Sequence, residues 1–488
     1  MNKPVILPML LAASLLLAAC GSAASASGLP LPSSVTQSAP RPPTWQGRPE
    51  YAPGELVDYT AQTGDTLPAL AGRFNTSVEE IYAANPFIPQ NATTMPPGMP
   101  MRIPVYYLPL WADPYQIIPD HAYVYGPTLV GFNASAFIAS HPGWLKDYRA
   151  WAGYDWRSGA EIADFVGLNY SINPRLLLAL LEYQAGALSL PEKPKTRFLL
   201  GYQRTYYESV YLQLVGAANT LNNGYYGWRN GSLIEFELKD GTLIRPDPWQ
   251  NAASVALQYY FATMLPADEY RLAVSPQGLF ALYAGLFGDP WQDSTELIPG
   301  SLEQPDLRLP FPPGRVWTLT GGPHTGFGHG VPFAALDFAP PSEFSGCFAV
   351  DEKDYAIAMA DGIVVRSETG TVVLDLDGDG DERTGWVIVY IHVGSDGRAP
   401  TGLSLKAGES VGYPSCEGGR TTGTHIHVAR KYNGEWIPAD GPLAFNLEGW
   451  VAHNGSEPYL GTLTKGSLTV TASAVSDLYS QIQSQAAP

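Results

Sequence analysis

The strongest constraint on the fold of this chain is a series of short β-branched runs that begins near Leu302. The runs YAIAMADGIVVRS, TVVLDLD and WVIVYIHV are separated by glycine-rich turns. Short runs rich in Val, Ile and Tyr and bounded by turn residues indicate antiparallel strands. The sequence therefore predicts an all-β antiparallel domain over residues 301–464, followed by a Ser/Ala/Gln-rich C-terminal tail over residues 465–488.

Histidines are scarce in this chain, yet two of its 8 histidines, His425 and His427, are separated by a single isoleucine. Side chains alternate between the two faces of a strand, so both imidazoles should project from one face. The same β-rich region holds His324 and Asp337 in GGPHTGFGHGVPFAALDFAPP, and His392 at the end of WVIVYIHV. Two histidines and a carboxylate with one open position describe a catalytic zinc site.

With these residues the chain resembles the M23 family of zinc endopeptidases, also called lysostaphin- or LytM-type. The segments MADGIVV and LKAGESVG resemble the hairpins of that family, and the resemblance spans about residues 316–450. It implies that His324, Asp337 and His427 hold Zn²⁺. It also implies that His392 and His425 are catalytic and handle the proton and the oxyanion, without showing which does which.

The spacing between the first two ligands leaves an alternative. Thirteen positions separate His324 from Asp337, which resembles the staphylolysin-like branch of the family. His329 lies eight positions before Asp337 and is a rival ligand; otherwise it is a solvated loop residue. The other histidines outside the pattern are expected to be structural: His121, His141 and His453.

An acidic stretch, DLDGDGDE, begins at Asp375 and starts like an EF-hand loop. The acidic residue that such a loop needs at its twelfth position is replaced by Trp386. An acidic, solvated hairpin turn is therefore the favoured interpretation, and a calcium site with other ligands stays open.

Near the N-terminus, residues 56–106 predict a strand–helix–helix–strand unit, with a capping box at Ser77 and Glu80. The GDTL turn, the Ile81, Asn85, Pro86 step and the closing IP resemble a LysM module. The resemblance implies binding of N-acetylglucosamine-containing glycans such as peptidoglycan. We expect the glycan-binding residues to be Gly64, Asp65, Thr66, Asn85 and Pro86. A small structural unit that binds nothing is the alternative.

Residues 107–300 are aromatic-rich and mostly helical in pattern, with INPRLLLALLEYQAG as the clearest helix. This helix resembles the one that opens lysozyme-like transglycosylase domains, where a glutamate acid stands at the position of Gln184. Glutamine cannot donate a proton as a carboxylic acid does, and Glu182 points about 200° away around the helix. We therefore expect a degenerate lysozyme-like domain, or an α-helical spacer whose leucine stripe is core.

The first residues predict export. Lys3 precedes an apolar run that ends in LAAC, which is typical of a lipoprotein signal peptide over residues 1–19, with Cys20 as the lipidated residue. A Pro/Ser/Ala-rich flexible linker over residues 20–55 follows. The two remaining cysteines, Cys347 and Cys416, are expected to form a disulfide in an oxidising compartment. The formal charge of −18 argues against a nucleic-acid partner.

These features predict a multidomain, lipid-anchored, extracytoplasmic protein of the cell envelope: a βααβ LysM module, a mostly α-helical lysozyme-like middle domain and an all-β antiparallel M23 peptidase domain. The predicted function is a zinc endopeptidase that cuts peptide bonds in peptidoglycan cross-links or stem peptides. One alternative is a non-catalytic LytM-type lipoprotein that binds peptidoglycan and activates amidases. Another is a glycan lyase in the middle domain, which Gln184 disfavours.

Overall fold

The computed structural model describes residues 48–106 and 112–485. The predicted signal peptide, the predicted lipid site Cys20 and the predicted linker up to residue 47 lie outside the described residues. Among the residues described, no helix is both long enough and apolar enough to span a bilayer.

The first described region is a strand–helix–helix–strand unit: β1 (Glu55–Thr60), α1 (Leu67–Phe74), α2 (Val78–Ala84) and β2 (Pro100–Val105). Local capping explains where its helices begin. The side chain of Thr66 accepts a hydrogen bond from the backbone N–H of Ala69, and Ser77 and Glu80 form the predicted capping box. The two strands pair antiparallel and enclose a small core of their own, so the βααβ order is confirmed.

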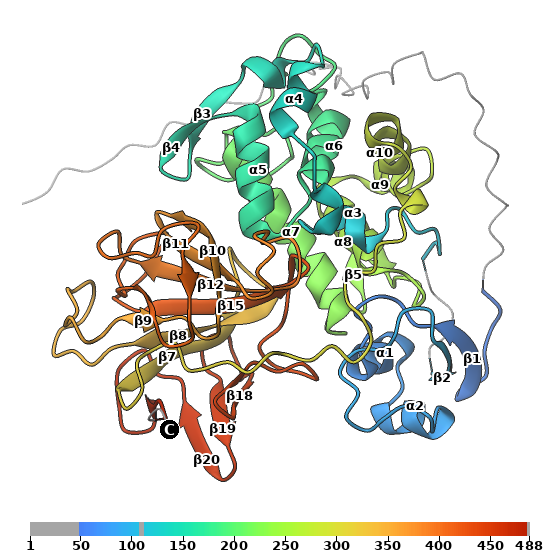
Figure 1. The fold of residues 1–488 in the computed structure, drawn as a ribbon. Helices are drawn as coiled ribbons and strands as arrows, with labels where there is room; N and C mark the ends of the chain where they lie inside the picture. Colours follow the sequence, from blue (N-terminus) through green and yellow to red (C-terminus); the bar gives the residue numbers. More distant parts are fainter. Residues whose placement is uncertain (1–47, 107–111, 486–488) are drawn as a thin grey trace, which may run out of the picture. The chain divides into compact units, whose positions relative to one another are not determined.

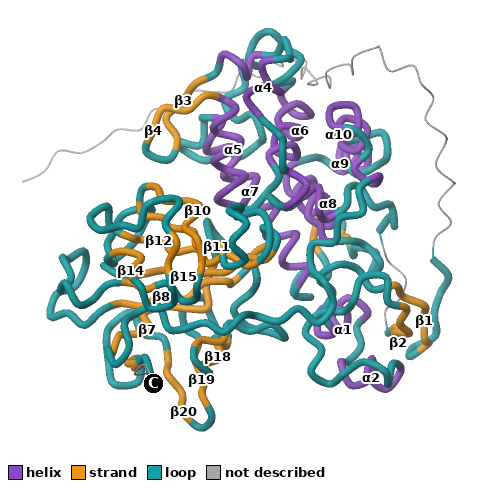
Figure 2. The backbone as a smooth tube through the Cα atoms, in the orientation of Figure 1, coloured by secondary structure: helices purple, strands orange, loops and turns teal. Residues whose placement is uncertain are grey.

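The second region is helical (Figure 2). Its helices are α3 (Asp120–Tyr123), α4 (Ala134–Ala139), α5 (Gly159–Tyr170), α6 (Pro174–Ala185), α7 (Val210–Arg229), α8 (Ala252–Met264), α9 (Ala267–Ala273) and α10 (Leu279–Phe287). It also contains the hairpins β3 (Arg149–Ala152) with β4 (Asp155–Ser158) and β5 (Phe236–Glu237) with β6 (Leu243–Ile244), and the 3₁₀ turns η1 (Pro127–Leu129), η2 (Trp144–Asp147) and η3 (Pro290–Gln292). Helix α6 begins after the N-cap Asn173 and ends at Gly186, where a φ of 55° suits glycine.

The third region is built on a nine-stranded antiparallel sheet (Figure 1). From one edge to the other the strands are β13 (Ser404–Leu405), β10 (Gly362–Glu368), β11 (Gly370–Asp375), β12 (Trp386–Val393), β15 (Ile426–Tyr432), β8 (Phe333–Ala339), β7 (Val316–Thr325) and β21 (Gln481–Gln483), with β16 (Glu435–Trp436) paired to β15. Two smaller sheets pair β9 (Ala356–Ile357) with β14 (Ser410–Gly412), and β17 (Asn446–Leu447), β18 (Trp450–His453), β19 (Thr462–Lys465) and β20 (Leu468–Thr471) in that order.

Both faces of the large sheet are buried, which explains why its central strands are apolar at nearly every position. On β12, Val387 and Val389 belong to the core that contains the helices, whereas Ile388 belongs to the core on the opposite face. On β11, Val373 and Val372 divide in the same way. The period of two thus assigns alternate residues to two different cores.

The C-terminal segment differs from the expected tail. Within residues 465–485, β20 completes the small four-stranded sheet, and β21 pairs with β7 in the register Gln481↔Thr318 and forms the edge of the large sheet. The Ser/Ala/Gln composition concealed these strands because both lie at sheet edges, where few side chains face a core. Ile482, which is 2% exposed, is the apolar residue that secures β21.

A buried arginine joins the three regions. Arg229, at the end of α7, pairs with Glu435 of β16 at 2.9 Å and with Asp120 of α3 at 3.0 Å, and it also donates to the carbonyl of Thr63 in the LysM-like unit. Residues from Gly47 onward accordingly group as one compact unit.

Candidate metal centre

Three side chains on adjacent strands meet at one point. His427 of β15 lies directly across from Asp337 of β8 in the antiparallel register, and β7 brings His324 to the other side of Asp337. Oδ1 of Asp337 is 2.9 Å from Nε2 of His324 and 3.2 Å from Nδ1 of His427. Ligand atoms of the three residues all lie within 4.8 Å of one another. The strand register therefore gathers a His–Asp–His group of the composition expected for zinc.

The hydrogen bonding of this group is incomplete. His324, Asp337 and His427 are 4%, 7% and 6% exposed, and both ring nitrogens of His324 and Oδ1 of Asp337 are buried without a hydrogen-bond partner in the described residues. Buried polar atoms are normally satisfied, and leaving them unsatisfied costs free energy. A metal ion bound by these atoms would satisfy them, so the residues present fit a zinc ion.

A backbone carbonyl orients His427. Nε2 of His427 lies 3.1 Å from the carbonyl oxygen of Gly326, which can only accept, so Nε2 carries the proton. Nδ1, which faces Asp337, is then the atom with a free lone pair. Metal-binding histidines commonly have their second ring nitrogen fixed in this way.

His392 and His425 border the metal group, and each ring donates a hydrogen bond from Nδ1 to a backbone carbonyl. His392 donates from Nδ1 to the carbonyl of Glu417 at 2.8 Å, and His425 donates from Nδ1 to the carbonyl of Gly423 at 2.9 Å. Their rings lie 4.5 Å apart between centroids, and Nε2 of His425 is 3.6 Å from Oδ1 of Asp337. The carbonyls leave Nε2 of each ring as the atom able to take up a proton.

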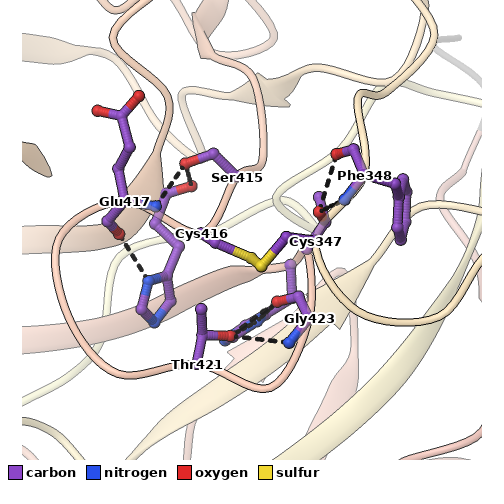
Figure 3. The surroundings of a disulfide bond; sticks show 10 residues. Cys347, Phe348, Ser415, Cys416, Glu417, Thr421 and Gly423 are labelled. Carbon is purple, nitrogen blue, oxygen red and sulfur yellow. Dashed lines mark hydrogen bonds between the residues drawn. A yellow bond between two sulfur atoms is a disulfide. The ribbon is translucent and has the colours of Figure 1, made fainter.

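A disulfide secures the loop that supplies these carbonyls (Figure 3). Cys416 precedes Glu417 and is bonded to Cys347, as predicted. Beside this bond, the backbone N–H of Phe348 donates to the hydroxyl of Thr424 at 2.8 Å, and that hydroxyl donates to the carbonyl of Phe348 at 2.9 Å. The segment before β15 is thus attached twice to the segment around Phe348.

Burial and mutual repulsion set the charges of the cluster. Burial alone would raise the pKa of Asp337, but the neighbouring imidazoles of His324 and His425 hold that pKa well below its usual value. Burial, followed by the charges of His425 and His427, lowers the pKa of His392 to about 3. Burial likewise lowers the pKa of His427. The centre therefore combines an ionised Asp337 with neutral His427 and His392 rings, and deprotonated ligand atoms are what a metal needs.

Comparison with known proteins finds two matching family models and a related protease. The family model of the LasA N-terminal domain matches residues 116–301, and the LysM domain model matches residues 59–104. Protease LasA of Pseudomonas aeruginosa is 25% identical over 350 residues, covering 66% of this chain and 75% of that protein. The chain is a LysM-bearing relative of M23-type metallopeptidases.

Two other proteins are similar to this chain over shorter lengths. The beta-lytic metalloendopeptidase of Achromobacter lyticus is 28% identical over 143 residues, covering 28% of this chain and 35% of that protein. The solved structure of the M23 metalloprotease pseudoalterin, from the deep sea, shares 20% identity. It has a TM-score of 0.30, and the match covers 35% of this chain and 96% of that one.

Tyr459 is a neighbour of the M23-like centre that the sequence patterns missed. Its ring stacks on the His324 ring with centroids 4.1 Å apart and planes 17° apart. A side chain at Gly321 would collide with this ring, so the glycine permits the approach. Tyr459 lies in a loop with a φ of 73°, outside any strand period, and only the three-dimensional structure reveals it.

Tyr390, which shares the predicted strand face of His392, does not reach the centre. Its hydroxyl accepts from the backbone N–H of Met359 at 2.9 Å inside the core. A φ of 67° at His392 breaks the alternation at the end of β12 and turns the imidazole toward the metal ligands. Tyr390 is therefore a core residue that holds the backbone at Met359.

The rival ligand His329 lies apart from the metal group. Its side chain is exposed, and its backbone N–H donates to Oδ1 of Asn219 on α7. The three histidines expected to be structural make local contacts: Nε2 of His121 with the carbonyl of Pro290, Nδ1 of His141 with the carbonyl of Phe137, and Nε2 of His453 with the hydroxyl of Thr464.

Three of the five residues expected to bind glycan in the LysM module take part in the module's own structure: Asp65, Thr66 and Asn85. Asp65 is fully buried, pairs with Arg73 at 2.7 Å and accepts from the hydroxyl of Tyr59. The Asn85 side chain is fully buried and bonds the backbone of Arg102. Thr66 caps α1, a side chain at Gly64 would meet the guanidinium of Arg229, and Pro86 is exposed.

Position 184 of the helical region holds a glutamine, which is not an acid. Oε1 of Gln184 accepts a hydrogen bond from the hydroxyl of Tyr260 at 2.6 Å. Oε2 of Glu182 accepts from the backbone N–H groups of Leu188 and Ser189. Both side chains therefore hold neighbouring structure in place.

Proposed function

We propose that this protein is a zinc metalloendopeptidase that hydrolyses peptide bonds in peptidoglycan cross-links or stem peptides. The observation that carries the proposal is the convergence of His324, Asp337 and His427 at a buried point, where both ring nitrogens of His324 and Oδ1 of Asp337 lack hydrogen-bond partners in the described residues. The similarity to protease LasA and to a beta-lytic metalloendopeptidase supports a peptidase.

In this proposal His324, Asp337 and His427 hold the zinc ion. Zinc bound there supplies Lewis acidity, which lowers the pKa of water toward about 7 and polarises a carbonyl. Asp337 contributes the negative charge, and the carbonyl of Gly326 keeps the lone pair of His427 Nδ1 directed at the site.

His392 and His425 perform the proton transfers. Because each donates from Nδ1 to a backbone carbonyl, each presents the lone pair of Nε2 at a fixed orientation. One ring can receive the proton of the attacking water, and the other, once protonated, can hydrogen-bond the developing oxyanion or return the proton to the leaving amine. The positive charge that develops is close to the ionised Asp337, which favours it.

Two proposed attachments hold the enzyme close to the peptidoglycan. A lipid on Cys20 would anchor the chain in the envelope membrane, and the LysM module would hold glycan. The limits 56–106, 107–300 and 301–464, and the lysozyme-like character of the helical region, remain predictions.

The decisive experiment is digestion of purified peptidoglycan, followed by labelling of new amino termini and mass analysis of the muropeptides. We expect new amino termini that disappear with a zinc chelator and return when zinc is added back. A metal-free protein that releases no amino termini, but stimulates a purified amidase, would replace the proposal with the adaptor function. New reducing ends would instead indicate glycan cleavage.

A further inference from the structure

Helix α7 of the helical region bonds to the β-rich region along one of its sides. Four of the side chains that make these bonds follow one another at intervals of four, three and three residues, which is the spacing of neighbours on one side of a helix. Their partners lie in the loop between β7 and β8 and in β16. The four residues are Asn219, Asn223, Tyr226 and Arg229.

Two asparagine side chains hold the loop between β7 and β8 to this helix. Oδ1 of Asn219 accepts a hydrogen bond from the backbone N–H of His329 at 2.6 Å. Oδ1 of Asn223 accepts one from the backbone N–H of Val331 at 3.0 Å. Nδ2 of Asn219 donates to the carbonyl of Val215 on the same helix at 2.8 Å, which orients the amide so that Oδ1 faces the loop. Both bonds to the loop use its backbone, so they do not depend on the loop's side chains.

Two glycines let the loop come this close to the helices. A side chain at Gly328 would lie 2.4 Å from the ring of Tyr170, and one at Gly330 would lie 2.0 Å from Oδ1 of Asn223. Their φ values are 82° and 89°, and glycine tolerates both the positive φ and the close approach. Between the asparagine contacts and β7, the rings of Phe327 and Tyr170 meet edge to face with centroids 5.1 Å apart.

The same loop carries the carbonyl that orients a metal ligand. Gly326 follows the ligand His324 by two residues, and its carbonyl accepts from Nε2 of His427 at 3.1 Å. The backbone N–H of Gly326 donates to the carbonyl of Pro332 at 3.1 Å, which closes the loop. A side chain at Gly326 would lie 2.9 Å from the Trp436 ring, so this part of the loop has no room to shift in that direction. The position of the carbonyl therefore depends on the shape of the whole loop.

We infer that Asn219 and Asn223 are positioning residues of the metal centre. They hold the loop in the shape in which the Gly326 carbonyl accepts from Nε2 of His427, so that Nδ1 of His427 stays directed at Asp337. Outer hydrogen bonds of this kind fix the orientation of a metal-binding imidazole. The inference rests on the proposed zinc site, and it gives the helical region a part in the chemistry of the β-rich region.

The test uses the full chain and two measurements: zinc affinity by competition with a chelating dye, and the visible absorption of the cobalt(II)-substituted protein. We expect Asn223→Leu, which removes the acceptor, to weaken zinc binding about tenfold and to change the cobalt absorption bands, because the coordinating imidazole loses its fixed orientation. Asn223→Asp keeps an acceptor oxygen and should give wild-type values in both measurements. Asn219→Leu breaks the neighbouring contact, should cause a similar loss, and serves if Asn223→Leu does not fold.

Thr220→Val is the matched control. Thr220 is adjacent to Asn219 on α7, but its hydroxyl accepts from the hydroxyl of Tyr202 and donates to the carbonyl of Gly216, both within the helical region. This variant should lower the melting temperature without changing zinc affinity or the cobalt spectrum. Circular dichroism and thermal melting establish that each variant is folded, and they report stability separately from metal binding.

In a wild type that binds zinc, three results would overturn this inference: wild-type affinity and spectrum in both asparagine-to-leucine variants, an equal loss in Thr220→Val, or a failure of Asn223→Asp to restore binding. The proposed function fails in other ways. A wild type without affinity for zinc would refute the metal centre itself. Zinc binding that depends on Asn223, without release of new amino termini from peptidoglycan, would refute only the peptidase.

Discussion

Two groups of potential metal ligands in the β-rich region differ in how their polar atoms are satisfied. At the centre on β7, β8 and β15, His324, Asp337 and His427 are buried, and several of their ligand atoms have no protein partner. In the turn after β11, Asp375 accepts from the backbone N–H groups of Asp377 and Gly380 at 3.1 and 2.9 Å, and both Asp377 and Asp379 are exposed.

The difference shows that a cluster of ligand-type residues is not by itself evidence for a metal. The acidic turn closes its own backbone, with carboxylates serving as acceptors for N–H groups two residues ahead, as is usual in Asx turns. The centre leaves buried atoms unsatisfied, which native proteins avoid unless something else binds there. Mutations can test whether this hydrogen-bond criterion separates a site from a turn.

The largest expected effect is at the ligand with the most fixed orientation. His427→Ala should abolish zinc binding, measured by elemental analysis, and reduce peptidoglycan cleavage by at least about 10³-fold, because the Lewis acid is lost. His329→Ala is the matched control, since it removes an exposed histidine outside the metal group and should keep both metal and activity. Zinc retained at wild-type stoichiometry in His427→Ala would refute the ligand assignment.

His425→Ala separates the roles within the centre. We expect loss of about 10²–10⁴-fold in cleavage with nearly full zinc content, since this residue is assigned to proton transfer and not to metal binding. Zinc content and the rate of appearance of new amino termini should be measured on the same preparation. If His425→Ala lost metal as completely as His427→Ala, the two assignments would have to be merged.

The sequence predicted the parts of the centre that depend on local strand geometry. The spacing of His425 and His427 is a period of two, so their common face follows from the strand alone. Antiparallel runs could be identified because both faces of the sheet are apolar. The capping box at Ser77 and Glu80 was equally local.

Contacts between distant segments could not be predicted from the sequence. Nothing in the spacing places Tyr459 on His324, or the Gly326 carbonyl on His427, because loops without a period bring them there. In the LysM module the quoted motif marks residues that build the fold: Asp65 and Asn85 are fully buried. Edge strand β21 was missed because it exposes most of its side chains.

Activity at the metal centre should also depend on contacts outside the ligand set, whereas the acidic turn after β11 should depend little on its surroundings. The double substitution Cys347→Ser with Cys416→Ser frees the segment whose Glu417 carbonyl orients His392. We expect cleavage to fall about tenfold while zinc is retained, as for loss of an outer contact to a catalytic histidine. Unchanged activity in a folded variant that lacks the disulfide would show that the Thr424–Phe348 hydrogen bonds are enough to hold this segment in place.

The smallest effect is expected in the acidic turn. Burial, followed by the neighbouring carboxylate of Asp377, raises the pKa of Asp375 against the opposing hydrogen bond from the Gly380 N–H. Because the pKa of Asp375 is raised in the folded state, the protonated carboxyl stabilises the fold. This contribution to the free energy of unfolding is complete below the unfolded pKa of about 4 and is lost as pH rises through the folded pKa. Asp377→Asn keeps an acceptor but removes the charge, so it should lessen that loss.

We therefore expect Asp377→Asn to increase the free energy of unfolding by about 0.5 kcal/mol at pH 7 and by nothing measurable near pH 3, where Asp375 is protonated. Urea unfolding at the two pH values measures the difference, and zinc content and cleavage should match the wild type. Thermal melting with added calcium tests the opposite interpretation of the turn, as a cation site. If calcium raised the melting temperature of the wild type but not of Asp377→Asn, the turn would be a cation site despite its satisfied carboxylates, and unsatisfied buried atoms would no longer distinguish the two clusters.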